Sequence, residues 1–389
     1  MLASLRHNIC QGISDYYLRN YGREALVVPS GRFGMYVIAM TFFHPGARVI
    51  ISPITCKTVI YALLSASVLP VFVDIDLSSG NIDVTKIPRD VLKSATGIIT
   101  TNLYGTPDNA LKIKELADSY ELVMVEDCAH VIDSSVQGNK IGTIGDVALF
   151  SFKKFFHLKG GVICARDVRL RDRMEAFIWK ECLFPQLHQE LKRVADFFRK
   201  RNDVCKLYQF VQRMKTFLRG KEVERKPAAS ELSRKYTIPQ LAYHSFLALT
   251  DPDYHVFPTV AELFRVLLKL EDILQIINRI NQRNATLLAK CHLPVVKSRY
   301  ESTACYMVVP YFCEQKNKII QKMLVDKKIP TWYTYDPPLN EVFANTLNLP
   351  RLNAHLPAAR EWCDKILPIN PFYMREYLAT INDVLESVH

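Results

Sequence analysis

The chain has 389 residues, of which 49% are hydrophobic and 23% are charged, a balance typical of a folded protein and not of a disordered one. Its longest apolar runs, residues 33–43 and 61–73, are shorter than the roughly 18 to 20 residues that a membrane-spanning helix needs. The net charge of +11 favours anionic partners such as phosphorylated small molecules, nucleic acid or a membrane surface.

The N-terminal residues and the cysteines favour a protein of a reducing compartment. The first residues lack a long apolar run followed by a small-residue cleavage site, so we expect no secretory signal. The ten cysteines form no CxxC pair and no metal-ligand spacing, and most lie among apolar neighbours, as in "GVICARD" at 161–167. A disulfide framework is the alternative, but the pattern favours buried free thiols, no metal site and a cytoplasmic protein.

Residues 27–165 alternate short β-rich runs with helix-like segments, which is typical of βαβ units in a largely parallel sheet. Such strands are apolar on both faces because helices cover both sides of the sheet. The predicted strands are residues 48–53, 69–76, 96–105, 121–130 and 146–152. The predicted intervening helices are residues 31–43, 57–67 and 109–120.

The character of the chain changes after residue 165. Residues 185–235 carry fourteen Lys and Arg against six Asp and Glu, and they predict a basic helical insertion. Residues 261–290 predict one long amphipathic helix. A strand at 304–312, a helix at 316–328 and a terminal helix at 370–388 follow. We therefore expect a large α/β domain over residues 1–250, which includes the insertion, and a smaller α+β domain over residues 251–389.

Polar residues stand out where the predicted strands end, and ligands of an open parallel sheet bind at that edge. Ser30 and Gly31 precede a helix, whose free amides can hold a phosphate, although helix capping is the simpler interpretation in isolation. The same two interpretations, capping the next helix or holding an anion, apply to Thr55. Each of these features alone is weak evidence for a phosphate-binding site.

The most informative strand ends are "VMVEDCAH", with Asp127 and His130, and "FSFKKFFHLKGG", with Ser151 and two adjacent lysines. An aspartate held by local amides and a solvent-exposed lysine pair are the simpler interpretations. Taken together, however, phosphate donors, a buried acid and a buried lysine are the groups that pyridoxal 5′-phosphate (PLP) requires. The lysine amine forms a Schiff base, and the acid keeps the pyridine nitrogen protonated.

At this point the sequence resembles the DegT/DnrJ/StrS-type sugar aminotransferases of the aspartate-aminotransferase fold (fold type I). The resemblance is carried in order by "PSGRFGMYV", "PGARVIISPITC", "LPVFVDIDLSSGNID", "NLYGTPDNALKIKELA", "VEDCAH" and "GDVALFSFKK...GG", with "IPTWYTYDPPLNEV" and "CDKILPINP" near the C-terminus. It implies an α/β fold with a mostly parallel central sheet flanked by helices and a smaller C-terminal domain.

The resemblance also implies roles for individual residues. Asp127 would pair with the ring nitrogen, His130 would lie against the ring or its phenolic oxygen, and Lys154 would form the Schiff base, with Lys153 as the alternative. The implied cofactor contacts are Ser30, Gly31, Arg32, Thr55, Cys56, Asp127, His130, Ser151 and Lys154.

Four features depart from the family's pattern. Cys56 stands where many members have an aromatic ring that stacks on the cofactor, and Asn102 stands where the family usually has His. Lys159 replaces an acidic residue that often precedes Gly-Gly, and residues 255–264 do not match the family's partner-subunit loop. These departures concern substrate recognition and subunit contacts.

The implied activity is transfer of an amino group from an amino acid such as glutamate to a keto sugar, typically nucleotide-linked, by a cytoplasmic homodimer. Two alternatives remain. One is a PLP-dependent sugar dehydratase of the same fold, in which a histidine such as His157 replaces the lysine, and the other is a non-catalytic regulatory or binding member.

The basic segment at 185–235 has three interpretations. It is a solvated helical cover, a rim that attracts a diphosphate substrate, or a peripheral contact with an anionic membrane surface, which its interleaved aromatic residues favour. No nucleic-acid-binding motif is found, so we expect no nucleic-acid partner.

Overall fold

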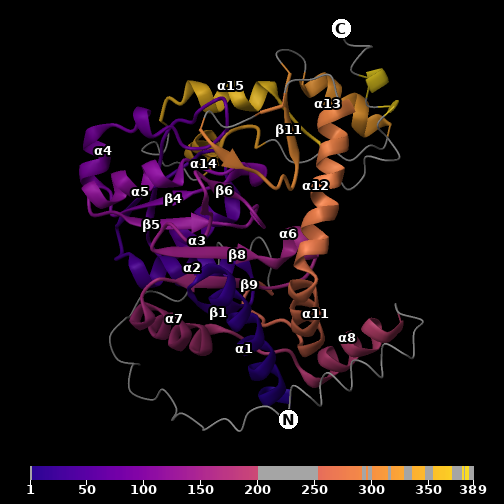
Figure 1. The fold of residues 1–389 in the computed structure, drawn as a ribbon. Coiled ribbons are helices and arrows are strands. Elements are labelled where there is room, and N and C mark those ends of the chain that lie inside the picture. Colours follow the sequence, from indigo (N-terminus) through magenta and orange to yellow (C-terminus); the bar gives the residue numbers. More distant parts are fainter. Residues whose placement is uncertain are drawn as a thin grey trace.

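A seven-stranded sheet forms the centre of the molecule (Figure 1). The computed structural model describes residues 2–199, 253–290, 295–296, 300–313, 317–327, 335–346, 354–369, 379–380 and 382–384. The strand order is β1-β9-β8-β5-β4-β2-β3. The strands are β1 (Glu24–Val28), β2 (Arg48–Ile51), β3 (Leu69–Phe72), β4 (Gly97–Thr100), β5 (Val123–Asp127), β8 (Val147–Ser151) and β9 (Gly161–Ala165).

Only β9 of these seven strands runs against the others, since it pairs antiparallel with both β1 and β8 while the remaining neighbours pair parallel. The predicted mostly parallel sheet is therefore confirmed. The sequence pattern predicted five of these strands but not β1 and β9. An apolar run such as residues 161–165 does not reveal a strand's direction or partners, because these depend on the folded chain.

Helices cover the sheet, and every residue of β4 and β9 is buried as a result. The covering helices are α1 (Leu2–Tyr21), α2 (Gly31–Phe42), α3 (Lys57–Ser65), α4 (Arg89–Ser94), α5 (Ala110–Ser119) and α7 (Val168–Glu181). α2 approaches β8 closely at Gly34, where an added Cβ would lie 2.6 Å from Leu149 Cδ1. This approach brings the start of α2 beside the end of β8.

The predicted long helix at 261–290 is two helices, which corrects the prediction. α11 (Val260–Glu271) ends at Asp272, and α12 (Ile273–Lys290) begins directly after it. Thr259 and Glu262 form a reciprocal capping box at the start of α11. The apolar spacing continues across Asp272, so periodicity alone does not reveal the break. Figure 1 shows the two helices following each other along one side of the molecule.

The C-terminal part lies above one edge of the central sheet in Figure 1. It contains a two-stranded antiparallel sheet of β11 (Val309–Phe312) and β12 (Ile366–Ile369). Its helices are α13 (Asn317–Asp326), α14 (Leu339–Thr346) and α15 (Pro357–Lys365). A second small sheet joins β10 (Ser302–Thr303) to β6 (Ser135–Val136) and β7 (Asn139–Lys140). The predicted helix at 370–388 falls mostly outside the described residues.

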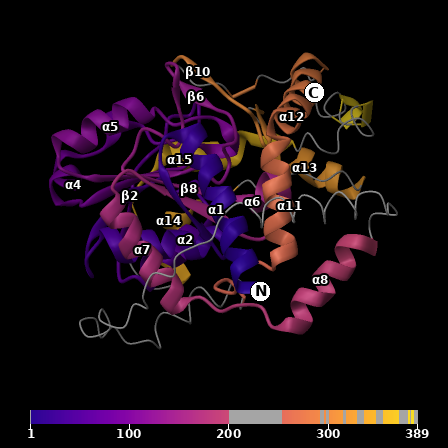
Figure 2. The ribbon, with the colours of Figure 1, turned by 60° about the horizontal axis from the view of Figure 1, so that its bottom comes forward.

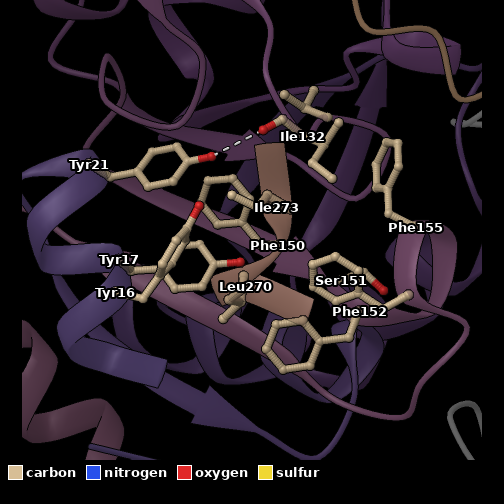
Figure 3. A pocket seen from close by; sticks show the side chains of 12 residues that line it. Tyr16, Tyr17, Tyr21, Ile132, Phe150, Ser151, Phe152, Phe155, Leu270 and Ile273 are labelled. Carbon is tan, nitrogen blue, oxygen red and sulfur yellow. Dashed lines mark hydrogen bonds between the residues drawn. The ribbon is translucent and has the colours of Figure 1, made fainter. Parts of the chain in front are cut away.

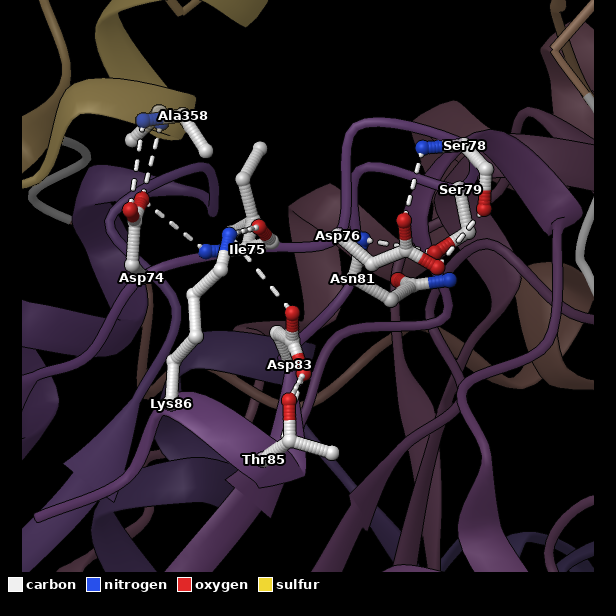
Figure 4. Close-up of polar contacts among 11 residues, drawn as sticks. Asp74, Ile75, Asp76, Ser78, Ser79, Asn81, Asp83, Thr85, Lys86 and Ala358 are labelled. Atoms are coloured by element: carbon white, nitrogen blue, oxygen red, sulfur yellow. Dashed lines mark hydrogen bonds and ion pairs between the residues drawn. The ribbon is translucent and has the colours of Figure 1, made fainter.

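Asp74, two residues after β3, ties the central sheet to the C-terminal part (Figure 4). Its carboxylate accepts the amides of Ala358 and Ala359 at the start of α15, at 3.2 and 2.9 Å, and also the amide of Ile75. Four amides at a helix start have no partner within the helix, and a carboxylate also interacts favourably with the helix dipole. The segment "FVDID" thus supplies a helix cap from a distant part of the chain.

Of the basic insertion, the structure describes α8 (Leu187–Arg199), and residues 200–235 lie outside the described part, as does the predicted domain boundary near 250. Buried Glu190 anchors α8, since it pairs with Arg6 of α1 and accepts the Val260 amide at 2.9 Å. Figure 2 shows α8 extending away from the sheet.

Two predictions about composition can be compared with the described residues. None of the eight cysteines in that part of the chain forms a disulfide, and six of them are buried, as predicted. No helix among the described residues is long and apolar enough to cross a bilayer.

Candidate active site

The polar residues predicted at strand ends gather at one edge of the sheet. β1, β2, β5 and β8 run in the same direction, so their carboxyl ends meet there. The residues brought to this edge are Ser30 and Gly31 after β1, Thr55 and Cys56 after β2, Asp127 and His130 at and after β5, and Ser151 and Lys154 at and after β8.

Only one of the two adjacent lysines turns toward this edge. Lys153 is exposed, whereas Lys154 is half-buried. Burial and the charge of Lys153 lower the pKa of Lys154, while the carboxylate of Asp127 acts in the opposite direction. The two lysines lie on a short helix, α6 (Phe152–Phe156), and not on a strand exit, so their side chains diverge by roughly 100° around the helix axis. Lys154 is the lysine that faces Asp127.

Asp127 is buried at the end of β5, and its backbone and side chain are both held. Its Oδ1 accepts the Ala129 amide at 2.9 Å, and its carbonyl oxygen accepts Asn102 Nδ2 at 3.0 Å. Among the described residues, the Ala129 amide is the only hydrogen-bond donor to the carboxylate. Burial raises the pKa of Asp127 to about 6, against the opposing effects of the Ala129 amide and Lys154. The second oxygen is available to a ligand.

His130 is buried three residues after Asp127 and is held as a neutral ring. Its Nδ1 accepts the Tyr104 amide at 3.2 Å, so the ring hydrogen is on Nε2. Burial and the nearby ammonium of Lys154 lower the pKa of His130 to about 3. The Tyr104 ring lies parallel to the imidazole, with centroids 6.3 Å apart and an interplanar angle of 7°. His130 therefore offers a hydrogen-bond donor and no charge at neutral pH.

The start of α2 lies against the end of β8. A Cβ added at Gly31 would contact Ser151 Oγ at 3.5 Å, so the Gly31 amide and the Ser151 hydroxyl are close neighbours. The Ser30 hydroxyl caps α2 by accepting the Phe33 amide, and it donates to the Tyr254 carbonyl at 2.7 Å. The capping interpretation thus describes the Ser30 side chain, and the first residues of α2 lie beside Ser151, where free helix amides are potential anion donors.

The residues after β2 differ from the prediction in one respect. Cys56, not Thr55, occupies the N-cap position of α3, and it makes no side-chain capping bond. Thr55 is buried one residue earlier, because the chain turns outward only after it. Cys56 is exposed, with its Sγ 3.1 Å from Thr58 Oγ1, and its thiol influences the pKa of Lys154. Arg32 is half-buried in the first turn of α2.

Glu126, the other acid of "VEDCAH", has a structural role that the sequence analysis did not separate from that of Asp127. Its carboxylate accepts three backbone amides, those of Gly142, Ile144 and Gly145, at 2.7 to 2.8 Å. These bonds fix the turn that leads into β8. The nearby glycines of "IGTIGD" are the signal that could have indicated this turn.

An aromatic pocket lies beside Ser151 (Figure 3). Tyr16, Tyr17 and Tyr21 of α1 form one wall, and Phe152 and Phe155 of α6 lie on the opposite side. The Tyr21 hydroxyl contacts the Ile132 carbonyl at 3.5 Å. The pocket therefore lies between α1 and the chain segments that follow His130 and Ser151.

Two further residues, His157 and Lys159, follow Lys154 along the chain. His157 is the exposed C-cap of α6, in a left-handed conformation. Lys159 donates from Nζ to the Asp253 carbonyl at 2.9 Å. No group of three or more His, Cys, Asp or Glu within the described ranges is arranged to hold a metal ion.

Residues 17–186, which include every predicted site residue, match the family model of the DegT/DnrJ/EryC1/StrS aminotransferases. This part of the chain is similar to that family over somewhat less than half of the chain's length. Among curated relatives, GDP-perosamine synthase of Escherichia coli O157:H7 is 30% identical over 159 residues, which are 40% of this chain and 44% of the relative. UDP-N-acetyl-3-dehydro-alpha-D-glucosamine 3-aminotransferase of Acidithiobacillus ferrooxidans is 31% identical over 196 residues, 44% of this chain and 53% of the relative. The chain thus matches about half the length of these family members.

The fold extends the similarity over the whole chain. The crystal structure of the aminotransferase TlmJ from Streptoalloteichus hindustanus superimposes with a TM-score of 0.68 at 17% identity, and it covers 98% of this chain and 92% of TlmJ. The expected fold type I architecture is confirmed.

Proposed function

We propose that the protein is a PLP-dependent aminotransferase that moves an amino group from an amino acid, most simply glutamate, to a keto group of a nucleotide-linked sugar. The placement of half-buried Lys154 near buried Asp127 and His130 carries this proposal. A partly desolvated amine beside a buried acid is destabilising unless the two serve a ligand or each other. The family and the names of the matched relatives support the class of reaction.

The residues at the sheet edge fit the parts of PLP. The available oxygen of Asp127 would pair with the ring nitrogen, and the Nε2 hydrogen of His130 would face the ring or its phenolic oxygen. The Gly31 amide, the adjacent Arg32 amide and the Ser151 hydroxyl would hold the phosphate. Thr55 and Cys56, after β2, border the same edge. When bound, PLP acts as an electron sink for the α-carbon of an amino acid.

Lys154 has the chemistry required of a proton carrier. Its lowered pKa keeps a larger fraction of Nζ in the neutral form near pH 7 than an exposed lysine would have. With PLP bound, neutral Nζ would take a proton from the α-carbon of the amino donor and would deliver that proton to the C4′ carbon of the cofactor. His157 does not fill this position, because it is exposed at the end of α6, and this favours amine transfer over the dehydratase alternative.

The remaining predictions belong to the same proposal. A nucleotide diphosphate is an anionic ligand suited to a chain of net charge +11. We infer a cytoplasmic homodimer with a large domain over residues 1–250 and a small domain over residues 251–389.

The insertion at 185–235 provides a cover, a substrate-attracting rim or a membrane contact. Size-exclusion chromatography with light scattering tests the dimer, and a fully active monomer at micromolar concentration would contradict it.

The decisive experiment compares the two lysines. Wild-type protein incubated with PLP should show the visible absorption band of a lysine-bound cofactor, and L-glutamate should shift it. Lys154→Ala should lose the band, whereas Lys153→Ala, altered one residue away at an exposed position, should keep it. A band that follows Lys153 instead would overturn the assignment.

Mass spectrometry then identifies the reaction. With L-glutamate and a panel of keto sugar nucleotides, an amino sugar product supports the proposal. A deoxy sugar without incorporated nitrogen would identify a dehydratase. A normal absorption band without any product across the panel would favour the regulatory alternative.

A further inference from the structure

A buried polar side chain, that of Asn102, joins the ends of β4 and β5 beneath the candidate site. Asn102 is fully buried and has a left-handed backbone, with φ 47° and ψ 52°. Its Nδ2 donates to the Asp127 carbonyl at 3.0 Å and to Thr100 Oγ1 at 3.2 Å, and its Oδ1 accepts the Asp108 amide at 2.9 Å. The hydrogen-bonding capacity of this amide is thus used to connect two neighbouring strand ends.

Asp108 holds Asn102 in this conformation. One Asp108 oxygen accepts the amides of Thr101 and Asn102, at 2.7 and 2.9 Å, and the other accepts the Ile82 amide at 3.2 Å. A left-handed backbone is uncommon outside glycine, and it persists only where the surroundings hold it. The Asp108 carboxylate supplies these bonds in a fully buried place, so the position of Asn102 is well determined.

The same bent segment reaches His130. Tyr104, two residues after Asn102, also has a positive φ, of 56°, and so does Gly105, at 96°. This path directs the Tyr104 amide to His130 Nδ1. Gly105 has no room for a side chain, because an added Cβ would lie 2.5 Å from the Cys305 carbonyl oxygen. The segment from Asn102 to Gly105 therefore packs closely against the backbone at Cys305.

We propose that Asn102 is a positioning residue, which aligns Asp127 through its side chain and His130 through the segment that it begins. The role rests on the proposed function of the site, because Asp127 and His130 are the groups expected to face PLP. Without the Asn102 side chain, the Asp127 carbonyl loses its buried donor and the end of β5 is free to shift. A misplacement of about 1 Å lowers a reaction rate by about 100-fold.

The test in the cofactor-free protein compares Asn102, in the loop after β4, with Asn81, a buried asparagine in the loop after β3 that bonds the segment following Asn102. Asn102→Gly keeps a residue suited to a positive φ and removes three side-chain hydrogen bonds. Asn81→Ala is the matched control, since Asn81 also makes three buried bonds, to Leu103, Thr106 and Pro107, but touches neither Asp127 nor His130. Carbon-13 NMR of the Asp127 carboxyl group reports its titration in each protein.

Asn102→Gly should lower the Asp127 midpoint by about one pH unit toward the value of a solvated aspartate, because water gains access to the loosened strand end. Asn81→Ala should leave the midpoint unchanged. Equal shifts in both variants, or no shift in either, would overturn the proposal. If Asn102→Gly does not fold, Asn102→Asp replaces it, since Asp tolerates the same backbone and keeps the acceptor oxygen but lacks the donor.

The second readout uses the holoenzyme with PLP labelled with nitrogen-15 in its ring. Asn102→Gly should move the ring-nitrogen signal toward the unprotonated form and lower kcat by about 100-fold, with KM for glutamate nearly unchanged. Asn102→His should restore part of both, because an imidazole N–H can replace the donor to the Asp127 carbonyl. A wild type that takes up no PLP would refute the proposed function, whereas the cofactor-free titration judges Asn102 independently.

Discussion

The turn held by Glu126 and the site edge at Asp127 lie on opposite faces of one strand, because successive residues of β5 point in opposite directions. The Glu126 carboxylate accepts three backbone amides, whereas that of Asp127 accepts one. A buried carboxylate saturated by amides has its role within the fold. One that retains an available oxygen at the mouth of a sheet is suited to a ligand. The number of internal donors distinguishes the two acids, although they are adjacent in the sequence.

The largest effect that this comparison predicts is the loss of activity in Asp127→Asn. The amide cannot keep a pyridine nitrogen protonated by charge, so we expect kcat for amine transfer to fall by about 1,000-fold, within the range found for proton-transfer groups. Steady-state kinetics with glutamate measure this, with circular dichroism as the check on folding. Activity within a few-fold of wild type would remove Asp127 from its proposed role.

Glu126→Gln should show the opposite profile, a loss of stability with activity retained in the folded fraction. The substitution places an NH₂ group or a weaker acceptor against three amide donors, which should lower the free energy of unfolding by about 3 kcal/mol. Urea denaturation measures this. A stable Glu126→Gln protein with strongly reduced kcat would show that Glu126 serves the chemistry and that the distinction between the two acids is wrong.

The pH dependence of stability provides a third comparison. The pKa of Asp127 is raised to about 6 in the folded protein from 3.8 in the unfolded chain, so the folded state binds the proton more tightly. The contribution of this proton to stability is therefore complete below about pH 4 and is lost as the pH rises through 6. The loss is on the order of 3 kcal/mol. The cofactor-free Asp127→Asn protein should lack it, which denaturation at pH 4 and pH 7 would test against wild type.

The smallest effect is expected at the exposed neighbour of Lys154. Lys153→Ala removes a positive charge that contributes to the lowered pKa of Lys154, so the pKa of Lys154 should rise slightly. Because Lys154 acts as a base in its neutral form, its titration gives the acidic limb of the kcat profile. This limb should shift to higher pH by a few tenths of a unit, with the plateau value of kcat nearly unchanged. A shift in the other direction would show that Lys153 acts on the site by another route.

Much of the candidate site could be predicted because its residues occur in short motifs at strand ends. Asp127, His130, Ser151 and Lys154 lie where the sequence analysis expected them. The different exposure of Lys153 and Lys154 depends on the helical geometry of α6, which an apolar pattern of five residues does not reveal. The structural role of Glu126 could not be distinguished from the proposed ligand-binding role of Asp127, because the three amides that bond Glu126 approach it only when the turn before β8 is folded.

The supporting network could not be predicted in the same way. Asn102 stood out in the sequence only as a departure from the family's pattern, and Asp108 did not stand out. Their interaction requires a left-handed backbone at Asn102. An asparagine tolerates this conformation, but its presence in a sequence does not predict it. The antiparallel strand β9 and the break at Asp272 were missed for a related reason, since both are set by what packs against the segment.

The sequence by itself determined the alternation of strands and helices, the polar residues at the strand ends and the similarity of residues 17–186 to an aminotransferase family model, because these depend on local pattern and motif. Only the tertiary structure decided which lysine faces Asp127, which acid is saturated by amides, and how Asn102 links Asp127 to His130. Burial and hydrogen-bond partners belong to groups that are distant along the chain, so they exist only once the strands have come together.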